Sequence, residues 1–102
     1  MAVIQVTKDN IDSEVFGYKG NVLIDFYADW CGPCRMLSPV VEEISNDFPQ
    51  YRVCKVNIDE QPELAQRFGV TSVPTLFVVK QGMVVNQSVG VVPKRNIILM
   101  LR

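Results

Sequence analysis

The stretch Trp30-Cys31-Gly32-Pro33-Cys34 decides how the rest of this chain is interpreted. Two cysteines stand three positions apart at the expected start of a helix, where side chains at i and i+3 lie about 5–6 Å apart. A disulfide needs Cβ atoms about 3.5–4.5 Å apart, so a small adjustment at a helix end can close the bond. The proline suits a first helical turn, which has no use for its missing N–H. The stretch therefore predicts a pair that switches between dithiol and disulfide.

The segments on either side of the cysteines indicate a strand before them and a helix after them. Residues 21–28 form a nearly continuous apolar run, which is typical of a central strand buried on both faces. Residues 32–48 repeat apolar side chains at helical spacing. A CxxC pair between such a strand and such a helix is typical of a redox motif.

The remaining segments extend this alternation of strands and helices. Further strands are predicted at residues 3–6, 52–58, 75–80 and 83–89. Further helices are predicted over residues 61–68 and 93–102, together with a brief helix that Asp9 or Asn10 caps and that runs through about Phe16. The turn Gln81-Gly82 joins the last two strands as a β-hairpin. We therefore expect an α/β fold in the order βαβαβαββα, with a mixed five-stranded sheet flanked by four helices on both faces.

Length and composition indicate one globular domain over residues 1–102. The 102 residues are 48% hydrophobic, which is enough for a core without disulfide staples. With 10 basic and 11 acidic residues and no run of like charge, nucleic acid and anionic membranes are not expected as partners. No stretch approaches the roughly 18 apolar residues of a membrane span. Residues 1–5 show no secretory signal, so we expect a cytoplasmic protein.

The cysteine and histidine counts restrict the chemistry further. There are three cysteines and no histidine. A metal site needs about four ligands, and only Cys54 could join the pair, so no metal ion is expected. Cys54 lies in the middle of a strand and is expected to be a buried core residue. Without histidine, proton transfer near pH 7 needs a carboxylate, a thiol or a lysine with an altered pKa.

One cysteine of the pair and one carboxyl group in the preceding strand are expected to have altered pKa values. Cys31 precedes the helix, whose free N–H groups and positive dipole end favour the thiolate that attacks disulfides. We predict that Cys31 is the nucleophile. Asp25 lies inside the apolar strand, and a carboxyl group buried there without a partner has a raised pKa. The alternative, a solvated Asp25 on an exposed face, fits poorly with a strand covered on both faces.

Over essentially its whole length the chain resembles the thioredoxin family. Four motifs carry the resemblance in the family's order and spacing: Ile24-Asp25-Phe26-Tyr27-Ala28-Asp29-Trp30-Cys31-Gly32-Pro33-Cys34, Lys55-Val56-Asn57-Ile58-Asp59, Val73-Pro74-Thr75 and Val89-Gly90. The resemblance implies a monomeric, general protein-disulfide reductase that passes electrons from a thioredoxin reductase to protein disulfides. It implies no bound cofactor, and no Gly-rich phosphate loop is present.

The resemblance also implies roles for individual side chains. Cys34 is the resolving cysteine, which attacks Cys31 in the mixed disulfide and frees the reduced substrate. Asp25 accepts the proton of the resolving thiol, and Lys55 tunes the charge of that carboxyl group. The competing interpretation of Lys55 is an ordinary solvated strand lysine. The resemblance implies that Trp30 is a partly exposed lid over the active site, and the alternative is an ordinary core residue.

An apolar substrate groove beside the nucleophile is a further implication of the resemblance. Its residues are Trp30, Gly32, Pro33, Val73, Pro74 and Gly90. The family carries a cis peptide bond before Pro74, and the backbone at Val73 can pair with an extended substrate. A small apolar patch around a nucleophile suits varied protein substrates. Val91 stands where a small residue often follows the groove glycine, which leaves the choice of partners open.

Two other functions compete with the reductase. The first is an oxidant or isomerase, whose members typically carry a histidine between the cysteines, whereas Gly32-Pro33 resembles the reducing members. The second is a binding module in a larger assembly, in which the cysteines matter little. The intact set of Cys31, Cys34, Asp25 and Pro74 argues against the binding module.

Overall fold

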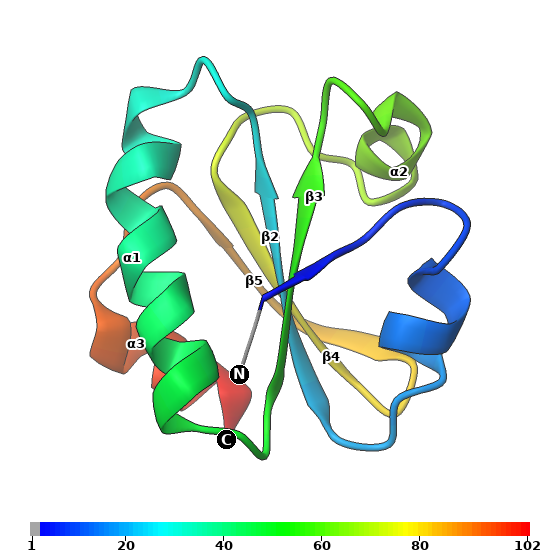
Figure 1. The fold of residues 1–102 in the computed structure, drawn as a ribbon, viewed down its shortest axis with the longest axis vertical. Coiled ribbons are helices and arrows are strands. Elements are labelled where there is room, and N and C mark those ends of the chain that lie inside the picture. Colours follow the sequence, from blue (N-terminus) through cyan, green and yellow to red (C-terminus); the bar gives the residue numbers. More distant parts are fainter. Residues whose placement is uncertain (1–2) are drawn as a thin grey trace.

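Helices cover both faces of a five-stranded sheet (Figure 1), as the alternating sequence pattern predicted. The computed structural model describes residues 3–102. The elements are β1 (Ile4–Gln5), the π-helical turn η1 (Asp12–Phe16), β2 (Asn21–Tyr27), α1 (Gly32–Asp47), β3 (Arg52–Asn57), α2 (Pro62–Arg67), β4 (Thr75–Lys80), β5 (Met83–Val89) and α3 (Lys94–Leu101). Residues 1–2, on which the expectations of no secretory signal and of a domain over 1–102 partly rest, lie outside the described residues.

The strand order places the cysteine pair at one edge of the sheet. The order is β1-β3-β2-β4-β5, with β3 parallel to β1 and β2, and β4 antiparallel to β2 and β5. Parallel strands end at the same edge of a sheet, and ligand sites of α/β proteins lie beyond that edge. The loops that follow β2 and β3 therefore lie close together, at the end of the molecule where α1 begins (Figure 1).

Alternation along the central strand β2 decides which face each side chain meets. Ile24 and Phe26 pack into the core cluster that holds Val15 of η1 and Leu64 of α2. Leu23 packs into the other cluster, against buried residues of α1 and α3. Since neighbouring strand residues point to opposite faces, Asp25 shares the face of Leu23 and looks toward α1. Backbone alternation thus turns a carboxyl group toward the helix that carries the cysteines.

The first helical segment differs most from the sequence prediction. A cap at Asp9 or Asn10 is predicted, but the N-cap is Ile11, without a side-chain hydrogen bond. A short π-helical turn follows from Asp12 to Phe16, and the Gly17 N–H donates to the Asp12 carbonyl at 2.7 Å. The Asn10 side chain instead accepts a hydrogen bond from the Thr7 N–H at 2.8 Å. Such side-chain bonds to the backbone compete with helix formation, which explains the later start.

The other predicted elements are present, with small changes at their ends. β1 is shorter than the predicted strand at residues 3–6, while β4 and β5 keep their predicted bounds. Within residues 3–102, no helix has both the length and the apolar character needed to cross a membrane.

Candidate active site

The cysteine pair forms a disulfide at the N-terminus of α1. Cys31 is the N-cap, Cys34 lies in the first turn, and their Cα atoms are 5.3 Å apart. The Cys34 N–H donates a hydrogen bond to the Cys31 Sγ at 3.1 Å. In the reduced protein the same N–H, together with the positive end of the helix dipole, would stabilise a thiolate at Cys31. The geometry therefore suits Cys31 as the attacking sulfur.

The two cysteines are equally buried. Because Cys34 lies a turn deeper along the helix, the sequence predicts that it is the more buried of the two. In the disulfide form each cysteine exposes 4% of its surface, so this prediction is wrong. The bond holds both sulfur atoms side by side beneath a common cover that includes Tyr27 and Val73. The Cys31 Sγ lies 3.6 Å from the Val73 carbonyl oxygen.

The segment that faces the disulfide is fixed by a contact with the end of β5. The Val73–Pro74 peptide bond is cis. The Pro74 carbonyl accepts a hydrogen bond from the Gly90 N–H at 2.8 Å. Gly90 has a φ of 90°, a backbone conformation that residues other than glycine rarely adopt. This contact brings two motifs that are distant in the sequence to the same side of the cysteine pair.

Trp30, the residue before Cys31, is anchored by a residue to which sequence reasoning assigned no role. Its side chain is 66% exposed, and its Nε1–H donates to Asp59 Oδ2 at 2.8 Å. The buried Asn57 side chain holds that loop by accepting from the Asp59 N–H at 2.9 Å. Asp59 lies two residues after the end of β3, and the shared edge of parallel strands is the signal that could have found it.

Replacement of Asp59 by alanine should free the Trp30 side chain. The lost hydrogen bond is worth about 0.5–1.5 kcal/mol, so a small loss of stability and a drop in turnover of less than about ten-fold are expected. Trp30 is the only tryptophan, so tryptophan emission, recorded with the cysteine pair in one redox state, reports the environment of this ring. Asp59→Asn, which keeps an acceptor, serves as the control. Identical emission from Asp59→Ala and the unchanged protein would show that the contact does not position the ring.

Asp25 is a buried carboxyl group without a donor for one of its oxygens. It is 3% exposed, and Oδ1 has no hydrogen-bond partner among residues 3–102. Burial raises the pKa of Asp25 from its usual value of 3.8 to about 7, and the charge of Lys55 opposes this rise. A carboxyl group with a pKa near 7 can both accept and release a proton at neutral pH.

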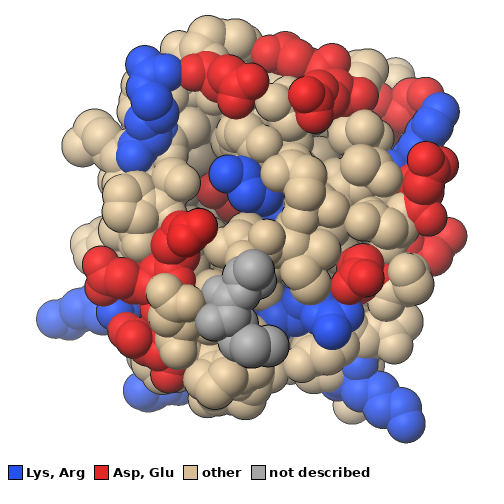
Figure 2. All heavy atoms as spheres, in the orientation of Figure 1, with Lys and Arg blue, Asp and Glu red and all other residues tan. Residues whose placement is uncertain are grey.

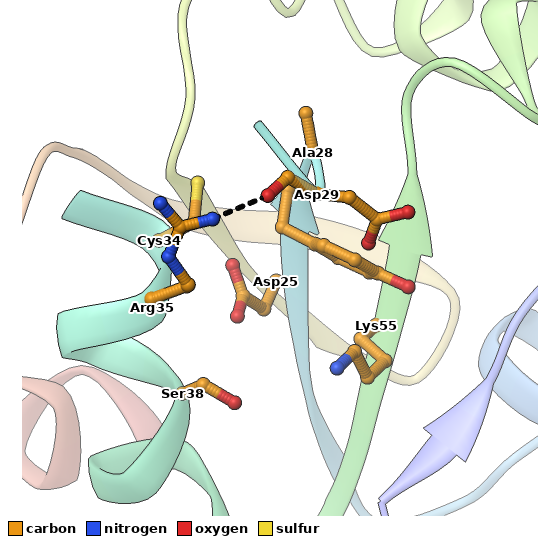
Figure 3. Close-up of a pocket in the computed structure, with 8 residues that line it drawn as sticks. Asp25, Ala28, Asp29, Cys34, Arg35, Ser38 and Lys55 are labelled. Atoms are coloured by element: carbon orange, nitrogen blue, oxygen red, sulfur yellow. Dashed lines mark hydrogen bonds between the residues drawn. The ribbon is translucent and has the colours of Figure 1, made fainter. Parts of the chain in front are cut away.

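A cavity of about 170 Å³ is lined by both this carboxyl group and Cys34 (Figure 3). It is lined by Asp25, Tyr27, Ala28, Asp29, Cys34, Arg35, Ser38 and Lys55. Lys55 is the register partner of Asp25 on β3, and its Nζ lies 4.3 Å from the centre of the Tyr27 ring. The structure thus brings together three of the residues to which sequence reasoning gave chemical roles, and it adds Ser38, to which none was given.

The outer rim of the site is acidic. The loops around the start of α1 and after β3 expose Asp29, Asp59 and Glu60. Figure 2 shows acidic side chains along the upper edge of the molecule, where Figure 1 places these loops. Arg35 offsets part of this charge, and its Nη1–H donates to the Asp29 carbonyl at 2.6 Å. The apolar cysteine pair therefore lies behind a largely anionic rim.

The third cysteine lies apart from this chemistry. Cys54 is fully buried in the core cluster on the face of η1 and α2, which confirms the expected core position. Burial raises the pKa of its thiol to about 12, so it stays protonated at neutral pH. Within residues 3–102, no three metal-ligating side chains come together to hold an ion.

Comparisons with known proteins agree on one family. The family model described as Thioredoxin matches residues 2–102. Thioredoxin 1 of Nostoc sp. is 45% identical over 97 residues, which cover 94% of this chain and 91% of the relative. A thioredoxin of Chlorobaculum thiosulfatiphilum is 42% identical over 94 residues, covering 91% and 87%. A thioredoxin of Staphylococcus saprophyticus is 43% identical over 98 residues, covering 95% and 92%.

Proposed function

Because the chain belongs to the thioredoxin family, a family of thiol–disulfide oxidoreductases, we propose that it is a general protein-disulfide reductase of cell redox homeostasis. The Cys31–Cys34 pair carries two electrons from a thioredoxin reductase to disulfides of other proteins. The observation that carries this proposal is the disulfide at the N-terminus of α1, with a carboxyl group of pKa about 7 lining the cavity beside it.

The reaction needs two displacements at sulfur. In the first, the Cys31 thiolate attacks a substrate disulfide, forms a mixed disulfide and releases one substrate thiol. In the second, Cys34 loses its proton and attacks the Cys31 sulfur, which breaks the mixed disulfide and releases the second substrate thiol. The Cys34 N–H supports the first step because it already points at the Cys31 Sγ, 3.1 Å away.

Asp25 is proposed as the acceptor of the Cys34 proton. Both residues line one cavity, and burial keeps the carboxyl pKa near the neutral range in which such a transfer works. Lys55 is proposed to tune this carboxyl group, since its positive charge opposes the effect of burial on the pKa. These two side chains supply the proton chemistry that histidine supplies in many other enzymes.

The substrate is proposed to lie across the cysteine pair as an extended segment. The groove would be formed by Trp30, Gly32, Pro33, Val73, Pro74 and Gly90. A strand that pairs with the backbone at Val73 would bring its own cysteine close to Cys31, because the Val73 carbonyl lies 3.6 Å from the Cys31 Sγ. Val89 and Val91 add exposed apolar surface at the end of β5. Backbone pairing and apolar contact suit many substrates rather than one.

The proposal includes the setting in which the protein works. We expect a monomeric thioredoxin domain over residues 1–102 in the cytoplasm, with neither nucleic acid nor membrane as a partner. The chain itself would need no cofactor, since the reductase supplies the electrons. This expectation rests on the balanced charge and on the family.

The equilibrium reduction potential of the Cys31–Cys34 pair tests the proposed direction of electron flow. A potential clearly below the roughly −200 to −230 mV of glutaredoxins is expected, together with reduction of insulin by the protein in the presence of dithiothreitol. A potential near the roughly −180 mV of protein disulfide isomerase would favour an oxidant or isomerase instead. The absence of any reversible two-electron couple would favour the binding module. A Cys31→Ser, Cys34→Ser double variant provides the inactive control.

A further inference from the structure

The active-site cavity contains one carboxylate oxygen that lacks a donor. Asp25 Oδ1 is buried and has no hydrogen-bond partner among the described residues, although it belongs to the group proposed to take the Cys34 proton. A buried charged oxygen without a hydrogen bond is costly, because nothing replaces the water that it loses. The cavity of about 170 Å³ has room for several water molecules and has polar walls.

The other donors around this cavity are directed elsewhere. The Tyr27 hydroxyl pairs with the Gln5 side chain, with 3.3 Å between the Tyr27 oxygen and Gln5 Oε1. The Arg35 guanidinium donates to the backbone carbonyl of Asp29 and not to the Asp25 carboxyl group. Lys55 acts on Asp25 through its charge, but its Nζ lies over the Tyr27 ring and forms no hydrogen bond or ion pair with Asp25 in residues 3–102.

Ser38 is the lining residue whose hydroxyl has no described partner. It lies four positions after Cys34 on α1, so both side chains are on the face of the helix that looks toward the sheet. The residue is half-buried, and no hydrogen bond of its hydroxyl occurs within residues 3–102. Figure 3 shows the hydroxyl turned from α1 toward the strands that carry Asp25 and Lys55.

We propose that Ser38 is a positioning residue, whose hydroxyl donates a hydrogen bond to one cavity water that in turn donates to the Asp25 carboxylate. This water bridge favours the ionised carboxylate and keeps it oriented toward the Cys34 thiol. This inference rests on the proposed function, since it concerns the second displacement of the same reaction.

The proton and electron balance of that step defines what Ser38 does. The Cys34 S–H bond breaks, and its proton passes to the Asp25 carboxylate. The Cys34 sulfur then bonds to the Cys31 sulfur, the bond from Cys31 to the substrate sulfur breaks, and the substrate leaves as a thiolate that takes a proton from water. The two electrons come from the cysteine pair. Ser38 gains and loses no proton overall, and it acts only through the carboxylate.

Replacement of Ser38 by alanine should raise the pKa of Asp25, because a water-mediated hydrogen bond to the charged form is lost. A rise of about one pH unit, which is a ten-fold change in the ionisation equilibrium, is expected for the loss of such a bond. The pKa of about 7 includes no hydrogen bond from Ser38, so it describes the carboxyl group of Ser38→Ala, and the unchanged protein should titrate about one pH unit lower. At pH 7 the ionised fraction would then fall from about nine tenths to about half. Resolution at pH 7 should slow about two-fold and return to the normal rate near pH 9. Lys55, Arg35 and Asp29, the other charged groups at this cavity, stay unchanged.

Two readouts on Ser38→Ala, Ser38→Thr and the unchanged protein test this inference. Carbon-13 NMR of the reduced protein follows the titration of the Asp25 carboxyl carbon. Rapid-mixing kinetics with insulin follow the pH profile of disulfide reduction. Ser38→Ala should move both curves to higher pH, and Ser38→Thr, which keeps the hydroxyl, should restore them. Thermal unfolding of each variant checks the fold.

The outcomes separate this inference from the proposed function. Superimposed Asp25 titrations for Ser38→Ala and the unchanged protein would overturn the role of Ser38, and so would an equal loss of rate at every pH. Failure of the unchanged protein to reduce insulin would instead count against the reductase. In that case the carboxyl titration would still decide whether the Ser38 hydroxyl acts on Asp25.

Discussion

Replacement of Cys34 by serine is expected to stop turnover and to trap the substrate on Cys31. The first displacement uses only Cys31, which keeps its place at the N-terminus of α1. The second displacement then has no thiol, because Cys54, the remaining cysteine, is buried in the core cluster on the other face of the sheet. Loss of an essential nucleophile costs at least about 10³-fold in turnover. Insulin reduction would measure this loss.

The trapped species gives a second, qualitative readout of the same variant. Non-reducing electrophoresis and mass spectrometry of Cys34→Ser after mixing with insulin should show a covalent adduct that dithiothreitol releases. Cys31→Ser should form no adduct, and Cys54→Ser should behave as the unchanged protein. Near-normal turnover in Cys34→Ser without any adduct would rule out Cys34 as the resolving cysteine.

Replacement of Asp25 by asparagine is expected to remove a large pH dependence of stability. The folded protein holds the Asp25 proton up to pH about 7, whereas the unfolded chain releases it near pH 3.8. Between these values the folded state binds more protons, so its free energy of unfolding falls as pH rises from about 4 to about 7 and stays low above that range. The difference of about three pH units corresponds to roughly 4 kcal/mol.

Denaturant unfolding at pH 4, 7 and 8 measures this effect. The unchanged protein should lose stability across the series, while Asp25→Asn should lose much less, because it has no carboxyl group at this site. At pH 8 the variant should be the more stable of the two. An identical pH dependence in both proteins would show that Asp25 titrates near its usual pKa and is not desolvated as the structure indicates.

The Asp25→Asn variant should resolve the mixed disulfide slowly, although its fold is stable. Without the carboxylate, the Cys34 proton has no buried acceptor, and general bases of this kind contribute about 10²–10⁴ in rate. Resolution by Asp25→Asn should therefore fall by about 10² at pH 7 and recover at higher pH, where the Cys34 thiol ionises without help. Full activity at neutral pH would remove the proposed proton transfer to Asp25.

Local sequence signals were sufficient for most of the fold. The turn Gln81-Gly82 fixes the ends of β4 and β5, because both residues adopt positive φ angles that close a hairpin, and the predicted bounds of both strands are correct. The N-cap of η1 was predicted one or two residues too early, because Thr7 and Asn10 hold the preceding backbone with their side chains. Apolar periodicity says nothing about such bonds.

The sequence by itself determined the chemistry, since the spacing of Cys31 and Cys34 and the carboxyl group of Asp25 within an apolar strand are local features. Only the tertiary structure decided how these groups are surrounded. It set the equal burial of the two cysteines, the Trp30 anchor on the loop after β3, and the cavity that Ser38 shares with Asp25. Burial and hydrogen bonding across the sheet depend on which distant segments pack together, and desolvation of a carboxyl group exists only once that packing has excluded water.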